Sequence, residues 1–400
     1  MYSTDELPII SLFTGAGGLD LGLEEAGFTT RVAVEKDKWA RQTLHGNRGH
    51  FRKEDFPILE DVTKHSADEI VDAAGLTTGE AFLVAGGPPC QSFSTAGRRA
   101  SLGDPRGSLF RNFAAVVDAA RPRFFVMENV RGLRSAAISH RPLLERGPDA
   151  PPLQPDEEQG SAFRVICNVL EEELGYQLTY GLLYAADFGA PQNRLRLIVL
   201  GSRDAEFLTR DLAHIVVPTH RGRWVTLRQA LLSLNGGPPE YLRYTPEREA
   251  ILRQVPEGMN WRYFRDHPDH GPERAAELMG GAWEADGGRV GFFRRLRWDR
   301  PSPTLPTSPI QKSTSLCHPS ETRPLSVQEY AAIQQFPPDY RFAGGTAQKY
   351  KQIGNAVPVG LGRAIGLGLS AAAGRQDPEA GQRRLFEATP VYAVASPDGS

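Results

Sequence analysis

The sequence predicts an α/β protein built on a mostly parallel sheet that helices cover on both faces. Short apolar runs at residues 9–13, 31–35, 81–87, 124–129 and 195–201 have the length and composition of buried strands. Amphipathic segments with helical spacing separate several of these runs. Because parallel strands are joined by crossover connections that pack on the sheet, this alternation indicates a layered α/β core.

The helical segments are identified by apolar residues that recur every three or four positions. Leu19, Leu23 and Ala26 form such a face directly after the first strand. Ser326 and Glu329 form a capping-box pattern that opens a later helix. Further helices are expected over 109–120, 163–174 and about 359–372.

The alternation stops after about residue 203. Residues 235–320 are rich in glycine, proline, arginine and aromatic residues, and carry no long periodic element. We therefore expect a large domain formed by 1–203 together with 319–372, and a smaller, irregular domain at 204–318. The polar stretch at 373–400 is expected to be a disordered tail.

Composition and charge are those of an ordinary globular protein, with 40% hydrophobic and 24% charged residues and a net charge of −2. No apolar run approaches the roughly 20 residues of a membrane helix, and no secretory signal opens the chain. Three cysteines cannot build a disulfide framework, and none has zinc-site spacing. We expect a cytoplasmic protein without membrane or metal. Arginine-rich patches at 98–111 and 289–300 could contact nucleic acid or could be solvated faces.

A glycine-rich turn joins the first strand to the first helix. Gly15, Gly17 and Gly18 allow the backbone to approach a ligand closely and to direct helix N–H groups at it. Glu35 ends the next strand, where acidic residues bind ribose hydroxyls in nucleotide-binding folds. Taken alone, the pattern fits either a nucleoside cofactor site or a structural turn.

Cys90 has the sequence context of a nucleophile. It follows the third strand through two prolines in GGPPCQSFS, so it should lie at the carboxyl end of a strand, where such sheets bind ligands. Its neighbours are glycine, proline, glutamine and serine rather than core-forming residues. Cys167 and Cys317 are instead expected to be buried core residues.

Three charged residues stand at the ends of two other strands. Glu128 closes an apolar strand, where an acid is costly unless it has a function or a partner. A salt-bridged or helix-capping glutamate is the alternative. Arg194 and Arg196 alternate, so on a strand they share one face and could clamp a carboxylate, a phosphate or a pyrimidine carbonyl. A surface ladder of arginines is the alternative.

The order of these motifs resembles the DNA (cytosine-5)-methyltransferase family, of the prokaryotic restriction–modification type. The elements are FTGAGG from Phe13, PPCQSFS, ENV, QNRLR and GNAVP at 354–358, and the resemblance covers nearly all of 9–372. It implies the Rossmann-like sheet of methyltransferases that use S-adenosylmethionine (SAM), with 204–318 as a target-recognition domain. It also implies a DNA cytosine-5-methyltransferase.

The resemblance implies a covalent mechanism on a cytosine that has left the DNA helix. Cys90 would add to carbon 6 of the ring, so that carbon 5 can take the methyl group. Glu128 would bind the base edge at N3, and Arg194 would hold the base carbonyl and orient Glu128. Arg196 would be a weaker catalytic candidate or a structural residue. Loss of the carbon-5 proton would then release Cys90.

The cofactor implied is SAM, with S-adenosylhomocysteine as product and no metal. Glu35 would bind the ribose, Lys36 would stand against the adenine, Asp61 would meet its amino group and Pro89 would lie near the methyl donor. The residues expected to hold the cofactor are Phe13, Gly15, Gly17, Gly18, Leu19, Glu35, Lys36, Asp61, Val62, Pro89, Asn355 and Ala356.

The implied partner is double-stranded DNA, from which the target base must be flipped out. A mobile loop at 91–111 would close over the DNA, the smaller domain would read the sequence with arginines, and Thr304 would lie beside the flipped nucleotide. The residues expected to contact DNA are Ser92, Arg98, Arg99, Arg106, Arg294, Arg295, Arg297 and Thr304.

Three alternatives remain at this point. A tRNA cytosine-5-methyltransferase would have the same fold, although the eukaryotic tRNA-directed member tends to carry CQPF and CFT elements, which this chain lacks. A non-catalytic DNA-binding relative would be expected to lose Cys90, Glu128 or Arg194. A nicotinamide oxidoreductase would leave PPCQSFS unexplained. We expect a monomer, and a cognate restriction endonuclease acting on the same site would form no stable complex with it.

Overall fold

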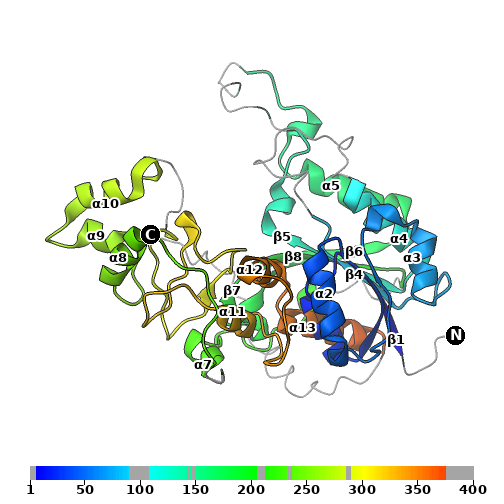
Figure 1. Cartoon of the computed structure of the whole chain (residues 1–400). Helices are drawn as coiled ribbons and strands as arrows, with labels where there is room; N and C mark the ends of the chain where they lie inside the picture. The colour runs from blue at the N-terminus through cyan, green and yellow to red at the C-terminus, as the bar shows by residue number, and fades with distance from the viewer. Residues whose placement is uncertain are drawn as a thin grey trace.

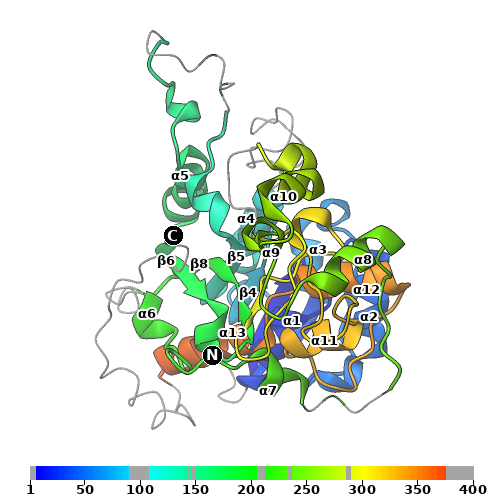
Figure 2. The same cartoon turned by 90° about the vertical axis from the view of Figure 1, so that its left-hand side faces the viewer.

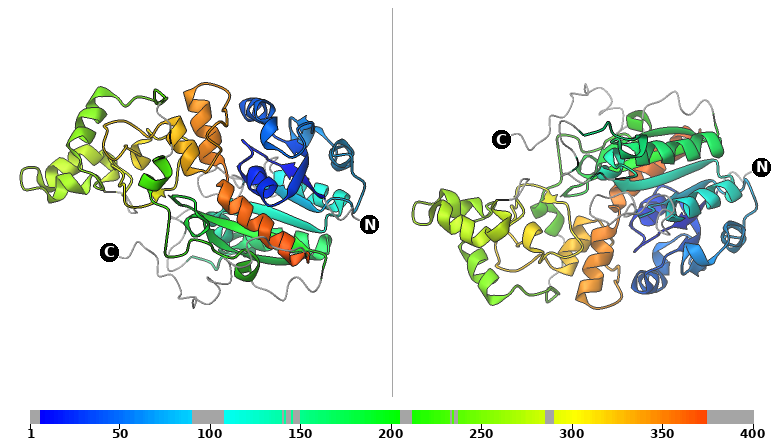
Figure 3. Two further views of the ribbon diagram at one scale, coloured as in Figure 1. Left: turned by 90° about the horizontal axis from the view of Figure 1, so that it is seen from below. Right: turned by 90° about the horizontal axis from the view of Figure 1, so that it is seen from above.

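The computed structural model describes residues 6–89, 108–139, 141, 145, 150–204, 212–232, 234, 237–284 and 290–374 of the 400-residue chain. The sheet with its helices lies at one end of the molecule and a smaller lobe at the other (Figures 1 and 3). In the described parts of the chain, no helix is long and apolar enough to cross a membrane. The expected tail lies almost wholly outside the described residues.

The main sheet has seven strands in the order β3-β2-β1-β4-β5-β8-β6. Strands β1 to β5 are parallel, whereas β8 runs antiparallel to both of its neighbours, β5 and β6. The strands are β1 (Leu7–Leu12), β2 (Phe28–Val34), β3 (Ile58–Leu59), β4 (Leu83–Gly86), β5 (Phe124–Val130), β6 (Gln177–Tyr184) and β8 (Leu195–Ser202). A two-residue pair joins β7 (Gln192–Asn193) to β9 (Ser302–Pro303).

The five predicted strands are confirmed, but β3 and β6 were not predicted. The β6 strand lies at the edge of the sheet, and most of its residues are exposed or only half-buried. An edge strand of this kind has no continuous apolar run, because only part of its surface faces a core. The predicted α/β class, with helices on both faces, is correct.

Helices cover each face of the sheet. One face packs against α3 (Ala67–Ala73), α4 (Ser108–Ala120) and α5 (Ser161–Asn168). The opposite face packs against α1 (Gly18–Glu25), α6 (Leu212–Ile215) and α13 (Val359–Ala372). The remaining helices are α2 (Lys38–Gly46), α7 (Leu227–Leu231), α8 (Pro246–Gln254), α9 (Arg262–Asp266), α10 (Gly271–Met279), α11 (Val327–Ile333) and α12 (Thr346–Asn355).

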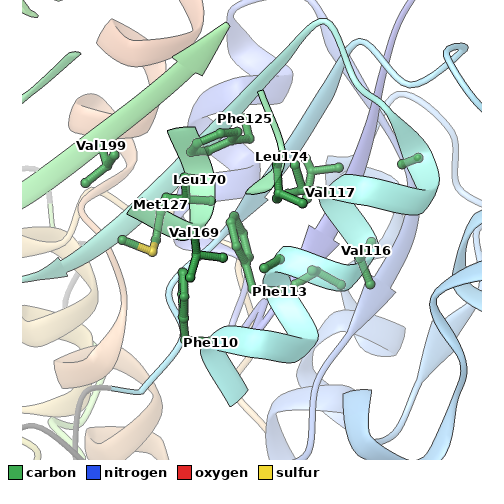
Figure 4. Close-up of a cluster of buried hydrophobic side chains, with 14 of the residues drawn as sticks. Phe110, Phe113, Val116, Val117, Phe125, Met127, Val169, Leu170, Leu174 and Val199 are labelled. Atoms are coloured by element: carbon green, nitrogen blue, oxygen red, sulfur yellow. The ribbon is translucent and has the colours of Figure 1, made fainter. Parts of the chain in front are cut away.

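Aromatic and aliphatic side chains fill the core between α4 and the sheet (Figure 4). Phe113 of α4 meets Phe125 of β5 edge to face, with 6.0 Å between ring centroids, and Phe125 lies 5.1 Å from Tyr176. Leu170 and Leu174 pack in the same cluster, where α5 continues as a π-helical turn. Each such side chain contributes about 1.5–3 kcal/mol on burial, so this face holds α4 firmly against β5.

The smaller lobe has its own core, formed by residues between 244 and 317. It includes Trp261, Phe264 and Phe293, and the three helices α8, α9 and α10 lie in this lobe (Figure 2). These helices are five to nine residues long, too short to show the sustained apolar repeat whose absence was noted in this stretch of the sequence. Cys317 is fully buried here and Cys167 is buried under the sheet, as predicted.

The segment between β5 and α5 projects away from the sheet (Figure 2). Arg141 ties its described part together by pairing with Glu157 and by donating to the carbonyls of Pro151 and Pro152. Both partners of this ion pair are largely buried. These contacts hold the two chain passes of the excursion together.

Helices α1 and α13 pack so closely that their backbones touch at glycines. A Cβ atom added at Gly22 would lie 2.2 Å from the Val359 carbonyl oxygen and 2.4 Å from the Arg363 nitrogen. A Cβ added at Gly18 would lie 2.3 Å from the Val357 carbonyl oxygen. The C-terminal segment is thereby held directly against the first helix.

We expect Gly22→Ala to lower the free energy of unfolding by about 3 kcal/mol, because backbone atoms cannot move aside as flexible side chains do. Urea unfolding at constant cofactor concentration measures the effect. Gly46→Ala is the matched control: the exposed Gly46 ends α2, and an added Cβ meets nothing within 4 Å. That control should be neutral or slightly stabilising, and equal losses in both variants would contradict the packing argument.

Candidate active site

The carboxyl ends of the parallel strands converge on a cavity of about 490 Å³. Loops that follow β1, β2, β4 and β5 form its walls together with the end of α12, as expected for ligand sites of open α/β sheets. The volume lies within the range of small-molecule sites. All the residues expected to hold a cofactor line this cavity except Gly17, which caps the N-terminus of α1.

The glycine turn is held in shape by Glu35. The Gly15 N–H donates to one carboxylate oxygen of Glu35 and the Asp37 N–H to the other, both at 2.7 Å. Phe13 and Gly15 have positive φ angles of 55° and 59°, so the chain turns sharply under the cavity. Burial raises the pKa of Glu35, and the two N–H bonds oppose that rise by stabilising the ionised form.

Two ion pairs stand at the rim of the cavity. Lys36 lies 3.1 Å from Asp61, and Lys351 of α12 lies 2.9 Å from Asp37, which caps α2. Burial opposes ionisation of Asp61, but hydrogen bonds from Thr63 and Lys36 outweigh it and lower the pKa of Asp61. Both acids are therefore ionised at neutral pH, and each has a cationic partner.

Glu128 is paired with Arg196 across two strands. The Nε of Arg196 lies 2.7 Å from a Glu128 carboxylate oxygen, and both side chains are nearly buried. In the β5–β8 register Arg196 stands opposite Val130, so it lies diagonally from Glu128 on the same face. Gly87 leaves room for the acid, because a Cβ there would lie 3.0 Å from Glu128 Oε2.

The expectation that Arg194 orients Glu128 is wrong, because that contact belongs to Arg196. Arg194 is 2% exposed and donates to the backbone carbonyls of Gly354, at 3.0 Å, and Asn355, at 3.4 Å. Burial, reinforced by the charge of Arg196, lowers the pKa of Arg194 to about 9, which still leaves it charged at pH 7. Arg194 lines the cavity and also fixes the chain segment that closes it.

The turn that leads to Cys90 is anchored at the same place. Asn129, on the opposite face of β5 from Glu128, donates to the Pro88 carbonyl at 2.8 Å. Pro89 lines the cavity and is exposed. Five predicted site residues lie outside the described part of the chain: Cys90, Ser92, Arg98, Arg99 and Arg106.

One residue expected to contact DNA has a different role. Arg295 is 6% exposed, and its guanidinium donates to the carbonyls of Leu252, Val255, His318 and Glu321 and to the Thr322 hydroxyl. With its donors bound internally it cannot read a base. This correction follows from burial in the lobe core, which an arginine-rich sequence alone does not reveal.

The other described candidates for DNA contact are more accessible. Arg297 is exposed and pairs with Asp299, whereas Arg294 is half-buried and donates to the Val290 carbonyl. The exposed Thr304 donates to the Asn193 carbonyl, next to Arg194. Thr304 therefore lies where the smaller lobe meets β7, directly before Arg194 in the chain.

Several residues of the cavity wall were not predicted. Ser11, Thr14 and Asp20 flank the glycine turn, and Lys351 and Gln352 come from α12. The positions of Ser11 and Asp20, on either side of a predicted turn, could have suggested the first group. The second group depends on the return of the C-terminal segment, which local sequence does not encode.

Residues 7–370 match the family model described as C-5 cytosine-specific DNA methylase. The chain is 39% identical to Type II methyltransferase M.PspPI of Psychrobacter sp., over 90% of this chain and 77% of that one. It is 34% identical to Type II methyltransferase M.Sau96I of Staphylococcus aureus, over 90% and 75%. A solved structure of a proposed DNA modification methyltransferase from an E. coli prophage is similar in fold, with a TM-score of 0.61, 23% identity and coverage of 92% and 100%.

A double-mutant cycle tests the pair at the end of β5. We expect Arg196→Met to lower the free energy of unfolding by about 3 kcal/mol, because it leaves a nearly buried carboxylate unpaired. Adding Glu128→Gln should restore part of that loss. The exposed pair of Arg297 and Asp299 is the control, with much weaker coupling expected under the same urea unfolding conditions. Additive effects at Glu128 and Arg196 would contradict the pairing.

Substitutions at Arg295 and Arg297 should have different effects, because the first side chain is buried in the lobe and the second is exposed. Arg295→Met should lower the free energy of unfolding by about 3 kcal/mol or more, since several buried carbonyls lose their donor. Arg297→Met should leave stability unchanged but weaken DNA binding and reduce the salt-dependence slope by about one. Urea unfolding and DNA binding at several salt concentrations measure the two effects. The reverse pattern would show that Arg295 is the DNA contact.

Proposed function

Because this chain belongs to the C-5 cytosine-specific DNA methylase family and is a DNA cytosine-5-methyltransferase, we propose that it methylates a flipped-out cytosine in a specific duplex sequence, with SAM as methyl donor. The observation that carries the proposal is a shared cavity. The glycine turn, the Glu128–Arg196 pair and the Pro89 turn before Cys90 all border it.

The cavity residues fit a nucleoside bearing an amino acid. When bound, SAM would supply a methyl group carried on a sulfonium, with S-adenosylhomocysteine as the product. Glu35, already fixed by two N–H groups, would accept from ribose hydroxyls, and Asp61 would accept from the adenine amino group. Asn355 and Ala356 would close the site from the C-terminal segment. The turn at Gly15 leaves open space where a side chain would otherwise stand.

Cys90 would attack carbon 6 of the cytosine. A Sγ–C6 bond forms, the electron pair of the C5–C6 double bond moves to carbon 5, and carbon 5 takes the methyl group. Loss of the carbon-5 proton restores the double bond and expels the Cys90 thiolate. Glu128 would hydrogen-bond or protonate N3 as the sulfur adds, and so take up the charge that develops in the ring.

Arg196 and Arg194 would have different roles at the site. Arg196, the partner of Glu128, would orient that carboxyl and could reach the base carbonyl from the same face of the sheet. Arg194 would have a structural role, because it donates to the Gly354 and Asn355 carbonyls and so fixes the cavity wall. Arg196 is therefore the stronger catalytic candidate of the two.

Duplex DNA would bind between the catalytic domain at 1–203 and 319–372 and the target-recognition domain at 204–318. Thr304, at the junction of the two, would lie beside the flipped nucleotide, and Arg294 and Arg297 would contact DNA. The relatives named above are Type II methyltransferases, which supports DNA rather than tRNA as the substrate. We place the enzyme in the bacterial cytoplasm, acting as a monomer in a restriction–modification system.

We expect Cys90→Ser to abolish methyl transfer while SAM binding and the unfolding transition stay close to wild type. The matched control is Cys167→Ser, because Cys167 is buried and burial raises its thiol pKa to about 11, which keeps it protonated and inert. Transfer of labelled methyl groups to DNA measures activity. Full activity in Cys90→Ser would overturn the catalytic assignment.

The covalent step has its own test. The target sequence is first mapped as 5-methylcytosine at base resolution after expression in a methylation-deficient host. A duplex carrying 5-fluorocytosine at that position should then trap the enzyme, because fluorine cannot leave as a proton does. The adduct, detected by denaturing electrophoresis and peptide mass, should form on Cys90. Normal methylation of cytosine without any adduct would refute the mechanism.

A further inference from the structure

Asp20 is a buried acid in the wall of the cavity. It lies in the first turn of α1, is 1% exposed, and belongs to the residues that line the cavity. The Ser11 side chain hydrogen-bonds to it, and Ser11 in turn lies 2.9 Å from the Thr14 hydroxyl under the glycine turn. The Oδ1 atom of Asp20 is buried without a hydrogen-bond partner.

Asp20 differs from the other acids that line the cavity. Asp37, Asp61 and Glu128 each have a cationic partner, and Glu35 accepts two backbone N–H bonds. Within the described parts of the chain, no lysine or arginine forms an ion pair with Asp20. Four cationic side chains of the described residues line the cavity, and each is engaged either with one of these acids or with backbone carbonyls: Lys36, Lys351, Arg194 and Arg196.

In the described parts of the chain, the groups around Asp20 add no positive charge. Glu24, one turn further along α1, disfavours ionisation of Asp20. Tyr340 approaches from the segment after α11, but its hydroxyl donates to the Ala16 carbonyl and burial raises its pKa above the usual range. Burial raises the pKa of Asp20 to about 7, against the hydrogen bond from Ser11. The acid is therefore poised between its two charge states near neutral pH.

The proposed cofactor and its product differ by one positive charge. SAM carries a sulfonium and an ammonium against one carboxylate, whereas S-adenosylhomocysteine has lost the sulfonium charge and is neutral overall. A charge of one sign in a cavity of low dielectric favours the opposite charge on a buried neighbour. Among the described acids that line the cavity, Asp20 is the one with neither a cationic partner nor two backbone N–H bonds, so it is free to respond.

We propose that Asp20 makes the cavity selective for the sulfonium form of the cofactor over the spent product. This inference rests on the proposed use of SAM. When SAM enters, the Asp20 carboxyl releases its proton to solvent and becomes the counter-charge of the sulfonium. When the methyl group has left, the carboxylate takes a proton back from solvent and the product is held less tightly. Asp20 thus acts as a specificity residue through charge, without contacting the methyl group.

The sign of the pH dependence follows from linkage. A cation that binds better to ionised Asp20 lowers the pKa of Asp20, so the affinity for SAM rises with pH through the region near 7 and then levels off. A decrease of one pKa unit corresponds to a tenfold gain in affinity. The neutral product has no net charge to couple, so its affinity should change much less.

The test is calorimetric binding of SAM and of S-adenosylhomocysteine to the full chain, without DNA, between pH 6 and 8. We expect the affinity ratio of SAM to product to rise several-fold with pH in wild type, with proton release on SAM binding measured in buffers of different ionisation enthalpy. Asp20→Asn should flatten the ratio and remove that proton release. An Asp20→Asn variant that keeps the wild-type pH dependence would overturn the proposal.

The matched control is Glu24→Gln. Glu24 is also buried on α1, and burial raises its pKa, but it is not among the residues that line this cavity. That variant should keep the rise of the affinity ratio with pH and the proton release, with the midpoint moved to lower pH because a negative charge near Asp20 is gone. If it flattens the ratio as Asp20→Asn does, a general effect on α1 replaces the proposed role. Failure of wild type to bind either ligand would instead refute the proposed cofactor.

The pH dependence of thermal stability gives a second test of the role of Asp20. The pKa of a buried acid such as Asp20 is higher in the folded than in the unfolded protein. Between pH 4 and 7 the folded state therefore binds more protons than the unfolded state. For this reason the contribution of the acid to the free energy of unfolding falls as pH rises. Asp20→Asn should therefore raise the melting temperature of the ligand-free protein at pH 8 more than at pH 5. A variant that is destabilised at pH 8 and unchanged in ligand selectivity would mark Asp20 as purely structural.

Discussion

The direct contact between the backbones of α1 and α13 is the constraint on which the active site depends. Glycines at the interface let the C-terminal segment approach until the Val357 carbonyl stands over Gly18. This contact brings Asn355 and Ala356, which precede α13, to the glycine turn that follows β1. Arg194 and Gln334 then secure the segment by donating to its carbonyls. The cavity is thus enclosed by parts of the chain more than 300 residues apart.

The antiparallel direction of β8 is what brings Arg196 to Glu128. An antiparallel strand begins at the edge of the sheet where its neighbour ends. Arg196, near the start of β8, therefore meets Glu128, near the end of β5. A parallel strand in the same place would have carried its first residues to the opposite edge. Because β8 alone runs against its neighbours in the sheet, an acid and an arginine meet at the same point of the cavity wall.

The central strands, the glycine turn and most of the residues that line the cavity beside it could be predicted because each is encoded locally. Apolar runs identify buried strands, and polar residues at the carboxyl ends of those runs identify the site. The edge strand β6 escaped prediction because one of its surfaces faces solvent, and the lobe helices because they are only one to three turns long. Such elements are defined by their neighbours rather than by their own periodicity.

The side-chain roles were harder to predict than the elements. Arg194 and Arg196 have the same type and spacing, and only the register of β8 against β5 decides which one meets Glu128. Arg295 looks like a DNA contact until the carbonyls that surround it are located. Asp20 has no distinctive sequence pattern. Its position is informative only because, among the residues that the structure describes, no lysine or arginine pairs with it.

The distance along the chain between the two walls of the cavity has a consequence for the newly made protein. Chains fold as they leave the ribosome, at roughly 5–20 residues per second. The glycine turn therefore emerges on the order of 20 to 70 seconds before the α12–α13 segment that completes the cavity. Until then the apolar faces that α13 will cover, on α1 and the sheet, stay open. Premature termination within the lobe would yield a chain that exposes this surface, a substrate for chaperones and proteases rather than a partial enzyme.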